Sequence, residues 1–408
     1  MQSVFQQRLN GLKQRHQELL SRPNRVSPEY DNGVLERFQH PILTADHVPL
    51  DWRYDLNEQS NPWLLQRLGI NAAFNPGAIE WNGKIALAVR LEGVDRKSFF
   101  AIAESDSGID GFRFRDEPIV MPQTEDPETN VYDMRLVRHQ DGWIYGLFCA
   151  ERRDSQAAAD DLSAAVAAAG IARTRDLIHW ERLPDLVSRS PQQRNVTLHP
   201  EFIDGKYALY TRPLNAFMAT DSGPGIGWAL LDDIENPRIE QEIVVDPRAY
   251  HTVKEGKNGL GPSPIRTSEG WLQLAHGVRE TAAGLRYVLY AFMTDLEEPW
   301  RVIHRPGGYL LAPRGAERVG DVSNVLFSNG WVVREDNTVL LYYAASDTRC
   351  HVARSSVERL VDYMKNTPPD AATSAACVRQ RLELIRNNRR LNYGSIAESV
   401  GGQTKRRR

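Results

Sequence analysis

Residues 78–89 have the sequence Ala-Ile-Glu-Trp-Asn-Gly-Lys-Ile-Ala-Leu-Ala-Val. Two apolar runs flank the pair Asn82-Gly83. A type I′ turn needs positive φ at both central positions, and asparagine followed by glycine meets that need better than most pairs. The stretch therefore predicts a β-hairpin with a two-residue turn.

The same arrangement of apolar strand, tight polar turn and aromatic-rich strand occurs five times along the chain. The turns fall at Gly83, Gly142, Gly205, Gly270 and Asn337, at intervals of 59, 63, 65 and 67 residues. Each interval leaves room for a second strand pair, such as residues 99–103 with 112–115. Four strands repeated five times predict an all-β protein, a five-bladed β-propeller. A large β-sandwich with coincidental spacing is the alternative.

Segments at both ends lie outside the repeats and show helical periodicity. Apolar residues recur at spacings of three, four and seven within residues 3–21, and residues 355–395 show two such stretches separated by Pro368-Pro369. We expect an N-terminal helix in residues 1–30, a catalytic propeller in 31–354, and a helical segment with a basic tail in 355–408. The terminal helices favour subunit contacts, hence a homo-oligomer. An alanine-rich insert at 156–169 predicts a further helix near the mouth of the site.

Composition narrows the class of protein. The 408 residues carry 50 basic and 53 acidic side chains, a formal charge of −3, so no global field would attract nucleic acid or an anionic membrane. Three cysteines give no disulfide framework, and no apolar run approaches a membrane span, so we expect a cytoplasmic protein. The ten histidines include no His-x-His or His-x-x-x-His pair, and we expect no metal and no other cofactor.

Asp133 is the main candidate for catalysis. It lies between Tyr132 and Arg135 at the entrance of a predicted strand, in a short polar cluster of the kind that precedes the first strand of each repeat. Such clusters would converge where the inner strands of a propeller meet. As a general acid, Asp133 would protonate a leaving group. The alternative is a structural aspartate that caps a turn and pairs with Arg135.

Cationic side chains form the second signal. Several lie at the ends of predicted inner strands or in nearby turns, among them Arg152, Arg194, Arg212 and Lys254. Arginine suits phosphate because its planar fork donates two parallel hydrogen bonds and stays charged. Arg152 and Arg194 have the most favourable positions. His251 and His276 are isolated in the sequence, and such histidines are more often structural than catalytic.

Several motifs resemble those of the mannoside phosphorylases of glycoside hydrolase family 130. They are Asn-Val-Tyr-Asp-Met-Arg at 130–135, Cys-Ala-Glu-Arg at 149–152, Ala-Arg-Thr-Arg-Asp-Leu at 172–177, His-Pro-Glu-Phe-Ile-Asp-Gly-Lys-Tyr at 199–207, Gly-Leu-Gly-Pro-Ser-Pro-Ile at 259–265 and Leu-Ala-His-Gly-Val at 274–278. The motifs occur in order, and the resemblance spans roughly residues 25–365. Within the family, the subgroup acting on 4-O-β-D-mannosyl-D-glucose is the most similar.

The resemblance implies a reversible, inverting reaction in which inorganic phosphate, a cosubstrate, attacks C1 of mannose. The products would be α-D-mannose 1-phosphate and D-glucose. The motif aspartate, here Asp133, would be the acid and would pass its proton through a mannose hydroxyl. The implied phosphate ligands are Arg152, Arg194, Arg212, His251 and Lys254. Polar partners for the sugar would come from Asn75, Arg90, Arg135, Glu201, His276 and Asp321.

A single catalytic carboxyl group together with cationic side chains that bind phosphate fits this chemistry. Because phosphate is itself the nucleophile, a second carboxylate acting as a base is dispensable. Two alternatives stay open. One is another activity of the same family: a β-1,4-mannooligosaccharide phosphorylase, or a β-mannoside hydrolase that uses Glu201 or Asp321 as base. The other is a noncatalytic sugar-binding propeller, which would need neither Asp133 nor phosphate.

Overall fold

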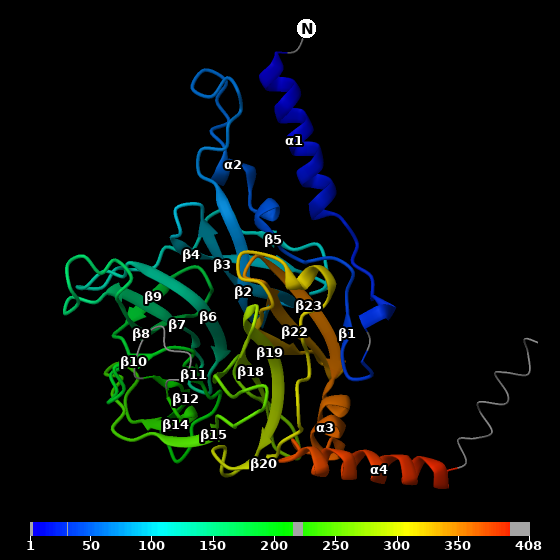
Figure 1. The fold of residues 1–408 in the computed structure, drawn as a ribbon. Helices are drawn as coiled ribbons and strands as arrows, with labels where there is room; N and C mark the ends of the chain where they lie inside the picture. Colours follow the sequence, from blue (N-terminus) through cyan, green and yellow to red (C-terminus); the bar gives the residue numbers. More distant parts are fainter. Residues whose placement is uncertain (1–2, 31, 215–222, 392–408) are drawn as a thin grey trace, which may run out of the picture.

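A computed structural model describes residues 3–30, 32–214 and 223–391, and β-strands are the main secondary structure of these residues (Figure 1). Antiparallel strands follow one another in five successive groups, which we call repeats 1 to 5. Repeat 1 comprises β2 (Ile70–Trp81), β3 (Lys84–Gly93), β4 (Ser98–Ser105) and β5 (Arg113–Phe114). Repeat 2 comprises β6 (Asn130–Arg138), β7 (Ile144–Arg153), β8 (Ala165–Thr174) and β9 (Trp180–Leu183).

The remaining repeats follow the same order. Repeat 3 comprises β11 (Thr197–Leu198), β12 (Tyr207–Thr211), β14 (Gly225–Leu231) and β15 (Ile243–Pro247). Repeat 4 comprises β16 (Lys257–Leu260), β17 (Ile265–Arg266), β18 (Trp271–Thr281), β19 (Gly284–Thr294) and β20 (Val302–His304). Repeat 5 comprises β21 (Leu326–Val333), β22 (Thr338–Ala345), β23 (Arg349–Ser356) and β1 (Glu36–Arg37). A separate pair joins β10 (Gln192–Gln193) to β13 (Pro213–Leu214).

Repeat 5 is completed from the other end of the chain. The short strand β1 pairs antiparallel with β23, with Glu36 opposite Arg354. Repeat 5 also meets repeat 1, because β2 and β21 form a parallel contact at Gly77 and Asn329. The first strands approach so closely that a Cβ on Gly77 would lie 2.5 Å from the carbonyl oxygen of Met134 in β6. The inner strands of repeats 5, 1 and 2 are therefore in direct contact.

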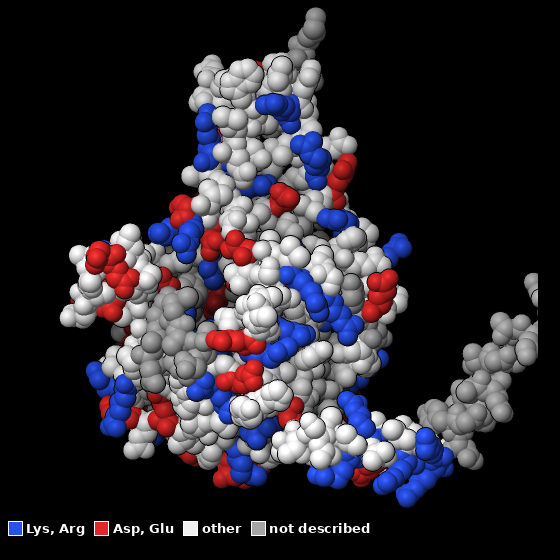
Figure 2. Space-filling model, viewed as in Figure 1, with Lys and Arg blue, Asp and Glu red and all other residues white. Residues whose placement is uncertain are grey.

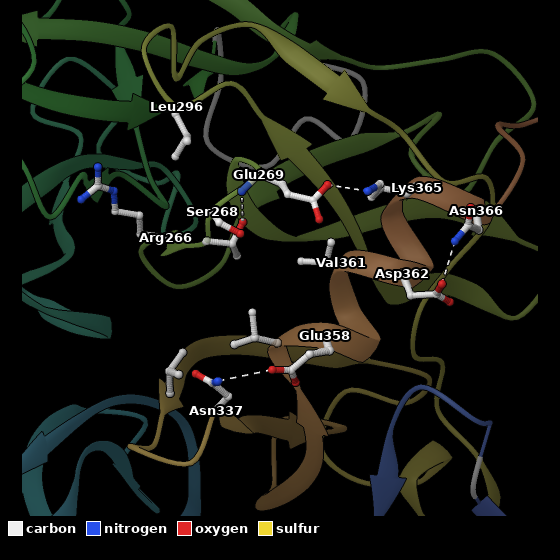
Figure 3. A pocket seen from close by; sticks show the side chains of 13 residues that line it. Arg266, Ser268, Glu269, Leu296, Asn337, Glu358, Val361, Asp362, Lys365 and Asn366 are labelled. Carbon is white, nitrogen blue, oxygen red and sulfur yellow. Dashed lines mark hydrogen bonds and ion pairs between the residues drawn. The ribbon is translucent and has the colours of Figure 1, made fainter.

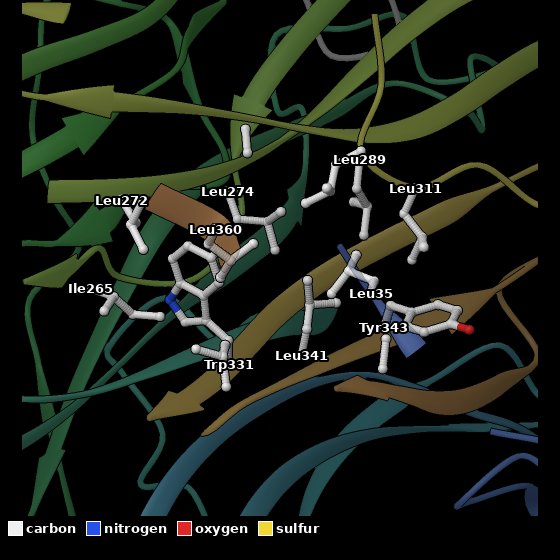
Figure 4. Packing of buried hydrophobic residues seen from close by; sticks show 14 of the residues in the cluster. Leu35, Ile265, Leu272, Leu274, Leu289, Leu311, Trp331, Leu341, Tyr343 and Leu360 are labelled. Carbon is white, nitrogen blue, oxygen red and sulfur yellow. The ribbon is translucent and has the colours of Figure 1, made fainter. Parts of the chain in front are cut away.

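The hydrophobic core is divided into clusters that each join two successive repeats. Repeats 1 and 2, 2 and 3, 3 and 4, and 4 and 5 each share one, and a fifth cluster joins repeat 5 to repeat 1. Side chains of a strand alternate between its two faces. In β22, Leu341 and Tyr343 accordingly face repeat 4 (Figure 4), whereas Leu340 and Tyr342 face repeat 1. Burial of both faces explains why these strands are continuous apolar runs, and the order of packing is cyclic.

Two of the five predicted turns have the type I′ conformation, whereas at Gly142, Gly270 and Asn337 only the second residue of the pair has a positive φ. Asn82 and Gly83 have φ values of 51° and 77°, and Asp204 and Gly205 have 52° and 74°, as a type I′ turn requires. The alanine-rich insert is a wrong prediction, because residues 165–174 form strand β8, which pairs along its length with β7. Alanine has a high helix propensity, but propensity contributes little energy per residue, and pairing with a buried neighbouring strand overrides it.

The helices lie around the sheet structure. They are α1 (Val4–Leu20), α2 (Leu50–Arg53), α3 (Val357–Asn366) and α4 (Ser374–Arg390), with short 3-10 turns at Pro28–Tyr30, Ala45–His47 and Gly315–Arg318. The predicted terminal helices and the break between α3 and α4 are thus present. Both α1 and α4 project from the body at different ends (Figure 1). None of the helices in the described ranges has the length and apolar character needed to cross a bilayer.

Candidate active site

A cavity of about 220 Å³ receives side chains from all five repeats. Polar and charged residues dominate its wall. They are Asn75, Arg90, Tyr132, Asp133, Arg194, Asn195, Arg212, Lys257, His276, Tyr287 and Asp347, with Leu285, Val322, Val325 and Phe327 as apolar neighbours. A wall of converging polar groups drawn from every repeat is typical of a site for a small hydroxyl-rich or charged ligand.

Asp133 lies in the cavity wall on a distorted part of β6. The pairing of β6 with β7 shifts register between Tyr132 and Arg135, and Asp133 has a φ of 62°. Such a bulge redirects a side chain, and aspartate tolerates the left-handed region better than most residues do. Asp133 Oδ1 accepts hydrogen bonds from Asn75 Nδ2 at 2.8 Å and Arg90 Nη1 at 3.2 Å. The carboxylate is therefore held in one orientation by repeat 1.

Arg135 lies behind the cavity instead of in its wall. Its Nη1 donates to the Asp133 carbonyl oxygen at 2.8 Å, its Nε to the Gly261 carbonyl oxygen at 2.8 Å, and its Nη2 to Asn195 Oδ1 at 3.1 Å. Complete burial lowers the pKa of this guanidinium to about 10. The side chain joins repeats 2, 3 and 4 beneath the site and fixes the backbone that carries Asp133.

Cations line another part of the wall, formed by Arg194, Arg212 and Lys257. Burial, followed by the charges of Arg212 and Arg194, lowers the pKa of Lys257 to about 7. Burial and the charge of Arg194 lower the pKa of Arg212 to about 9. Within residues 3–30, 32–214 and 223–391, neither Arg212 nor Lys257 forms an ion pair with a carboxylate. Like charges buried together favour binding of an anion between them.

His276 lies beside this cationic group. Its Nε2 is 3.2 Å from Arg212 Nη1, and burial together with the neighbouring cations lowers the pKa of the imidazole well below its usual value. The ring is therefore neutral, and Nε2 accepts a hydrogen bond from the guanidinium. The histidine orients Arg212 without adding a further charge.

Asp347 is a second carboxylate in the wall. It occupies the turn between β22 and β23 with a φ of 50°. Burial and the charge of Asp133 raise the pKa of Asp347 to about 7. The main charges that act on it are those of Asp133 and Arg90, whereas the main charges that act on Lys257 are those of Arg212 and Arg194. The cavity thus has an acidic part and a cationic part.

The structure brings together six of the residues singled out in the sequence. Asn75, Arg90, Asp133, Arg194, Arg212 and His276 all line the cavity. Lys257, Tyr287 and Asp347 also line the cavity, and no sequence motif indicates them. Lys257 opens a four-residue strand and Asp347 lies in an ordinary-looking polar turn, so their convergence depends on how the repeats pack.

Besides Arg135, five predicted ligands do not line the cavity, so the structure does not place them at the site. Arg152 instead forms ion pairs with Asp126 at 3.1 Å, Glu128 at 3.4 Å and Asp185 at 2.8 Å. Lys254 is bound to the buried Asp246 at 2.6 Å. The three partners of Arg152 come from loops outside its own strand β7, and Asp246 lies in β15. Sequence position alone reveals neither arrangement.

The other three are His251, Glu201 and Asp321. His251 follows the highly exposed Tyr250 and stacks against it in a tilted arrangement. Glu201 forms an ion pair with Arg266 at 3.6 Å. Asp321 is exposed, and its backbone N–H donates to Thr348 Oγ1 at 3.0 Å. A residue near the start of an inner strand therefore does not always face the centre.

Replacing Lys254 by methionine should destabilise the fold without weakening phosphate binding. Asp246, which also accepts from Tyr290 Oη at 2.7 Å and Arg305 Nε at 3.0 Å, would lose its main cation in a buried setting. We expect the free energy of unfolding in urea to fall by about 3 kcal/mol. Lys206→Met, which removes an exposed pair with Asp232, is the matched control and should cost less than about 1 kcal/mol. A tenfold rise in the KM for phosphate at unchanged stability would instead make Lys254 a phosphate ligand.

Comparison with known proteins identifies relatives. The family model of glycoside hydrolase family 130, described as β-1,4-mannooligosaccharide phosphorylase, matches residues 40–366. The 4-O-β-D-mannosyl-D-glucose phosphorylase of Bacteroides fragilis is 59% identical over 389 residues, covering 95% of this chain and 99% of the relative. The β-1,4-mannooligosaccharide phosphorylase of Ruminococcus albus is 38% identical over 182 residues, covering 43% of this chain and 52% of the relative.

Solved structures share the fold. The β-1,2-mannobiose phosphorylase from Listeria innocua, in complex with β-1,2-mannobiose, superimposes with a TM-score of 0.64 at 20% identity, covering 84% of this chain and 99% of the other. At that identity the likeness concerns the fold alone.

Proposed function

The chain belongs to glycoside hydrolase family 130, and from this premise we propose that it cleaves 4-O-β-D-mannosyl-D-glucose with inorganic phosphate. The products are α-D-mannose 1-phosphate and D-glucose, with inversion at C1, and the reaction is reversible. Similarity to the Bacteroides fragilis enzyme over nearly the full length of both chains supports phosphorolysis.

One observation carries the mechanism, namely the separation of charge within the cavity. The cationic part, with Arg194, Arg212 and Lys257, suits phosphate. The acidic part has the carboxyl groups of Asp133 and Asp347, with Arg90 paired to Asp133, and suits the hydroxyl groups of the mannosyl residue. We propose that phosphate and Asp133 act on opposite sides of C1, which is the geometry an inverting displacement requires.

In the proposed reaction, a phosphate oxygen forms the new bond to C1 as the bond from C1 to the glucose oxygen breaks. The departing oxygen takes the proton of the Asp133 carboxyl group, relayed by a mannose hydroxyl. Phosphate supplies its own electron pair, so no general base is needed. Asn75 and Arg90 hold the carboxylate in place. Lys257, Tyr287 and Asp347 join the site, and Arg135 is a positioning residue.

The hydrolase alternative needs a base facing an attacking water. Glu201 and Asp321, the candidates from the sequence, do not line the cavity. Asp347 does, but its raised pKa of about 7 and its place beside Asp133 favour contact with the sugar.

Incubation of the protein with mannosyl-β-1,4-glucose, with and without phosphate, tests the proposal. We expect mannose 1-phosphate and glucose only when phosphate is present, and slower turnover of β-1,4-mannobiose. Free mannose released without phosphate would support the hydrolase, and faster turnover of mannobiose would support the mannooligosaccharide phosphorylase. Sugar binding without turnover of either disaccharide would support the binding protein.

Raising the pH should weaken phosphate binding through Lys257. Its ammonium group is charged below a pKa of about 7 and neutral above it, so the cationic part loses one charge as the pH rises. We expect the KM for phosphate to rise about tenfold more between pH 6 and pH 8.5 in the wild type than in Lys257→Arg, which keeps its charge throughout. The paired measurement cancels the ionisation of phosphate itself. Parallel pH profiles of the two proteins would remove Lys257 from the phosphate site.

We also propose that the five repeats are the blades of a five-bladed propeller spanning residues 31–354, flanked by segments 1–30 and 355–408. The cyclic order of the core clusters supports this architecture. A cytoplasmic location is supported by the free thiols of Cys149, Cys350 and Cys377. A homo-oligomer is supported by the projecting terminal helices.

A further inference from the structure

Arg90 belongs to a buried ionic group beside the cavity, unlike the ion pairs of the protein surface. Acidic and basic side chains are interspersed over the face that Figure 2 shows. The pair Glu269–Lys365 beside α3 is of this kind, with side chains 44% and 41% exposed (Figure 3). The side chains of Arg90, Glu92 and Asp133 are only 13%, 15% and 12% exposed. Because a buried ion pair often stabilises a fold no more than apolar residues would, this group calls for a functional explanation.

The three nitrogens of the Arg90 guanidinium donate to three different residues. Nε donates to Ser98 Oγ at 2.9 Å, Nη2 to Glu92 Oε2 at 3.1 Å, and Nη1 to Asp133 Oδ1 at 3.2 Å. Since a guanidinium is planar and rigid, the first two acceptors fix the direction from which Nη1 meets the carboxyl group of Asp133. Ser98 and Glu92 are not among the described residues that line the cavity, so they act on Asp133 only through Arg90.

Ser98 is itself held by repeat 2. It is the first residue of β4, it lies opposite Glu92 in the pairing of β3 with β4, and its N–H donates to Asn130 Oδ1 at 2.7 Å. Asn130 begins both β6 and the sequence motif at 130–135 that contains Asp133. The bond from Ser98 to Asn130 therefore ties the acceptor of Arg90 to the strand that carries Asp133.

Glu92 supplies a charge that Asp133 supplies only part of the time. As an acid, Asp133 is neutral while it holds its proton and negative after it has given the proton up. A buried guanidinium without a carboxylate partner is costly. Glu92 lies two residues after Arg90 on the same face of β3, and its second oxygen accepts from Asn71 Nδ2 at 3.2 Å. It therefore keeps Arg90 paired while Asp133 is protonated.

The hydrogen bonds to Asp133 distinguish its two oxygens. Asn75 Nδ2 and Arg90 Nη1 both donate to Oδ1. An oxygen that accepts two hydrogen bonds is a poor site for the proton, so the protonated acid carries it on Oδ2. In the reaction, Oδ2 gives this proton to a mannose hydroxyl, and the hydroxyl's own proton passes to the departing glucose oxygen. The carboxylate that remains is stabilised by Arg90.

We propose that Glu92 and Ser98 are positioning residues for this proton transfer. They hold Arg90 on Oδ1 of Asp133 in both protonation states of the carboxyl group, which leaves Oδ2 to carry the proton. The inference rests on the proposed function of Asp133 as the acid. Phosphate binding should not depend on either residue, because the cationic part of the cavity is formed by side chains outside repeat 1.

Initial rates with both substrates saturating test the proposal in Ser98→Ala and Glu92→Gln. We expect each change to lower kcat about tenfold, the lower end of what a hydrogen bond to a charged group contributes, and to leave the KM for phosphate within twofold. Ser98→Thr keeps the hydroxyl group and should recover most of the lost rate. The matched controls are Ser105→Ala, at the other end of β4, and Glu104→Gln, which removes the charge of a pair with Arg115 in the same repeat. Both should keep the wild-type kcat.

A double variant separates action through Asp133 from a general effect on the fold. With asparagine at position 133, no carboxyl proton remains to be positioned, so adding Ser98→Ala should lower the residual rate less than twofold further. A further tenfold loss in that background would overturn the inference. So would Ser98→Ala and Glu92→Gln variants that keep kcat within twofold of the wild type while Asp133→Asn is inactive.

Failure of the proposed function would look different, because Asp133→Asn itself would then keep the wild-type rate. Melting temperatures, measured on every variant, identify any that fail to fold. Glu92→Gln keeps the size of the side chain and an oxygen that can accept from Arg90, so it keeps the test decisive if Ser98→Ala is unstable.

Discussion

Replacing Asp133 by asparagine is expected to reduce the rate of mannose 1-phosphate formation by about 10³-fold or more at saturating substrates. Asparagine keeps an oxygen that can accept from Asn75 and Arg90, so the local structure should be preserved. It cannot supply the proton that the departing glucose oxygen requires, and general acid catalysis of this kind contributes about 10² to 10⁴-fold. Initial rates measured with both substrates saturating report the loss directly.

Two companion variants make the Asp133 experiment specific. Asp204→Asn is the matched control, because Asp204 occupies an exposed hairpin turn with a φ of 52° that asparagine also tolerates, and its activity should equal that of the wild type. Asp347→Asn tests the second carboxylate of the cavity. If Asp133→Asn keeps more than a tenth of the activity while Asp347→Asn loses it, Asp347 is the acid and the assignment of Asp133 is wrong.

Replacing Arg212 by methionine is expected to raise the KM for phosphate about 100-fold. Hydrogen bonds to a charged group contribute about 1.5–3 kcal/mol, which corresponds to roughly 10- to 150-fold in affinity. Arg212 is 5% exposed and lies among other cations, so the same change should also relieve repulsion in the phosphate-free protein. We therefore expect the variant to unfold at the same or a higher temperature than the wild type without phosphate.

Arg212→Met should weaken phosphate binding without lowering the melting temperature of the phosphate-free protein. This combination distinguishes the loss of a phosphate ligand from a general loss of stability. Phosphate should raise the melting temperature of the wild type, because a ligand stabilises the state that binds it, and should raise that of the variant much less. Arg248→Met is a matched control, since Arg248 donates to the Gly256 carbonyl oxygen away from the cavity wall and should keep the response to phosphate. A variant that melts far below the wild type and still responds to phosphate would assign Arg212 a structural role.

Part of the fold could be predicted from the sequence because turn chemistry is local. Asn82-Gly83 and Asp204-Gly205 specify their own backbone conformation, and so they mark the repeats. The pairing of β1 with β23 was not predictable in this way, since two residues near the N-terminus carry no strand signal of their own. The alanine-rich insert at 156–169 has the composition of a helix, yet its last five residues belong to strand β8, because pairing with β7 decides their conformation.

Some residues of the candidate site could be predicted because a functional polar residue stands beside an apolar strand pattern in the sequence. Asn75 and Asp133 are polar residues just before the apolar runs of β2 and β6, and the structure places both at bulges within these strands. Arg152 is equally suitable by its position at the end of β7, yet its partners come from the loop before β6, which carries Asp126 and Glu128, and from the loop after β9, which carries Asp185. Lys257 and Asp347 have no such local pattern, because Lys257 reaches the cavity through the packing of repeats 3 and 4, and Asp347 through the packing of repeat 5 with repeats 1 and 2.

The pairing of Glu36 with Arg354 also constrains how the protein can be made. Ribosomes add residues from the N-terminus at about 5 to 20 per second, so β1 emerges roughly 15 to 60 s before the partner that lies 318 positions later. During that interval the nascent chain has four repeats at most and an unpaired first segment. The pairing of β1 with β23 must therefore follow translation of nearly the whole chain. A stalled or truncated polypeptide lacks this pairing and exposes apolar faces that chaperones and proteases recognise.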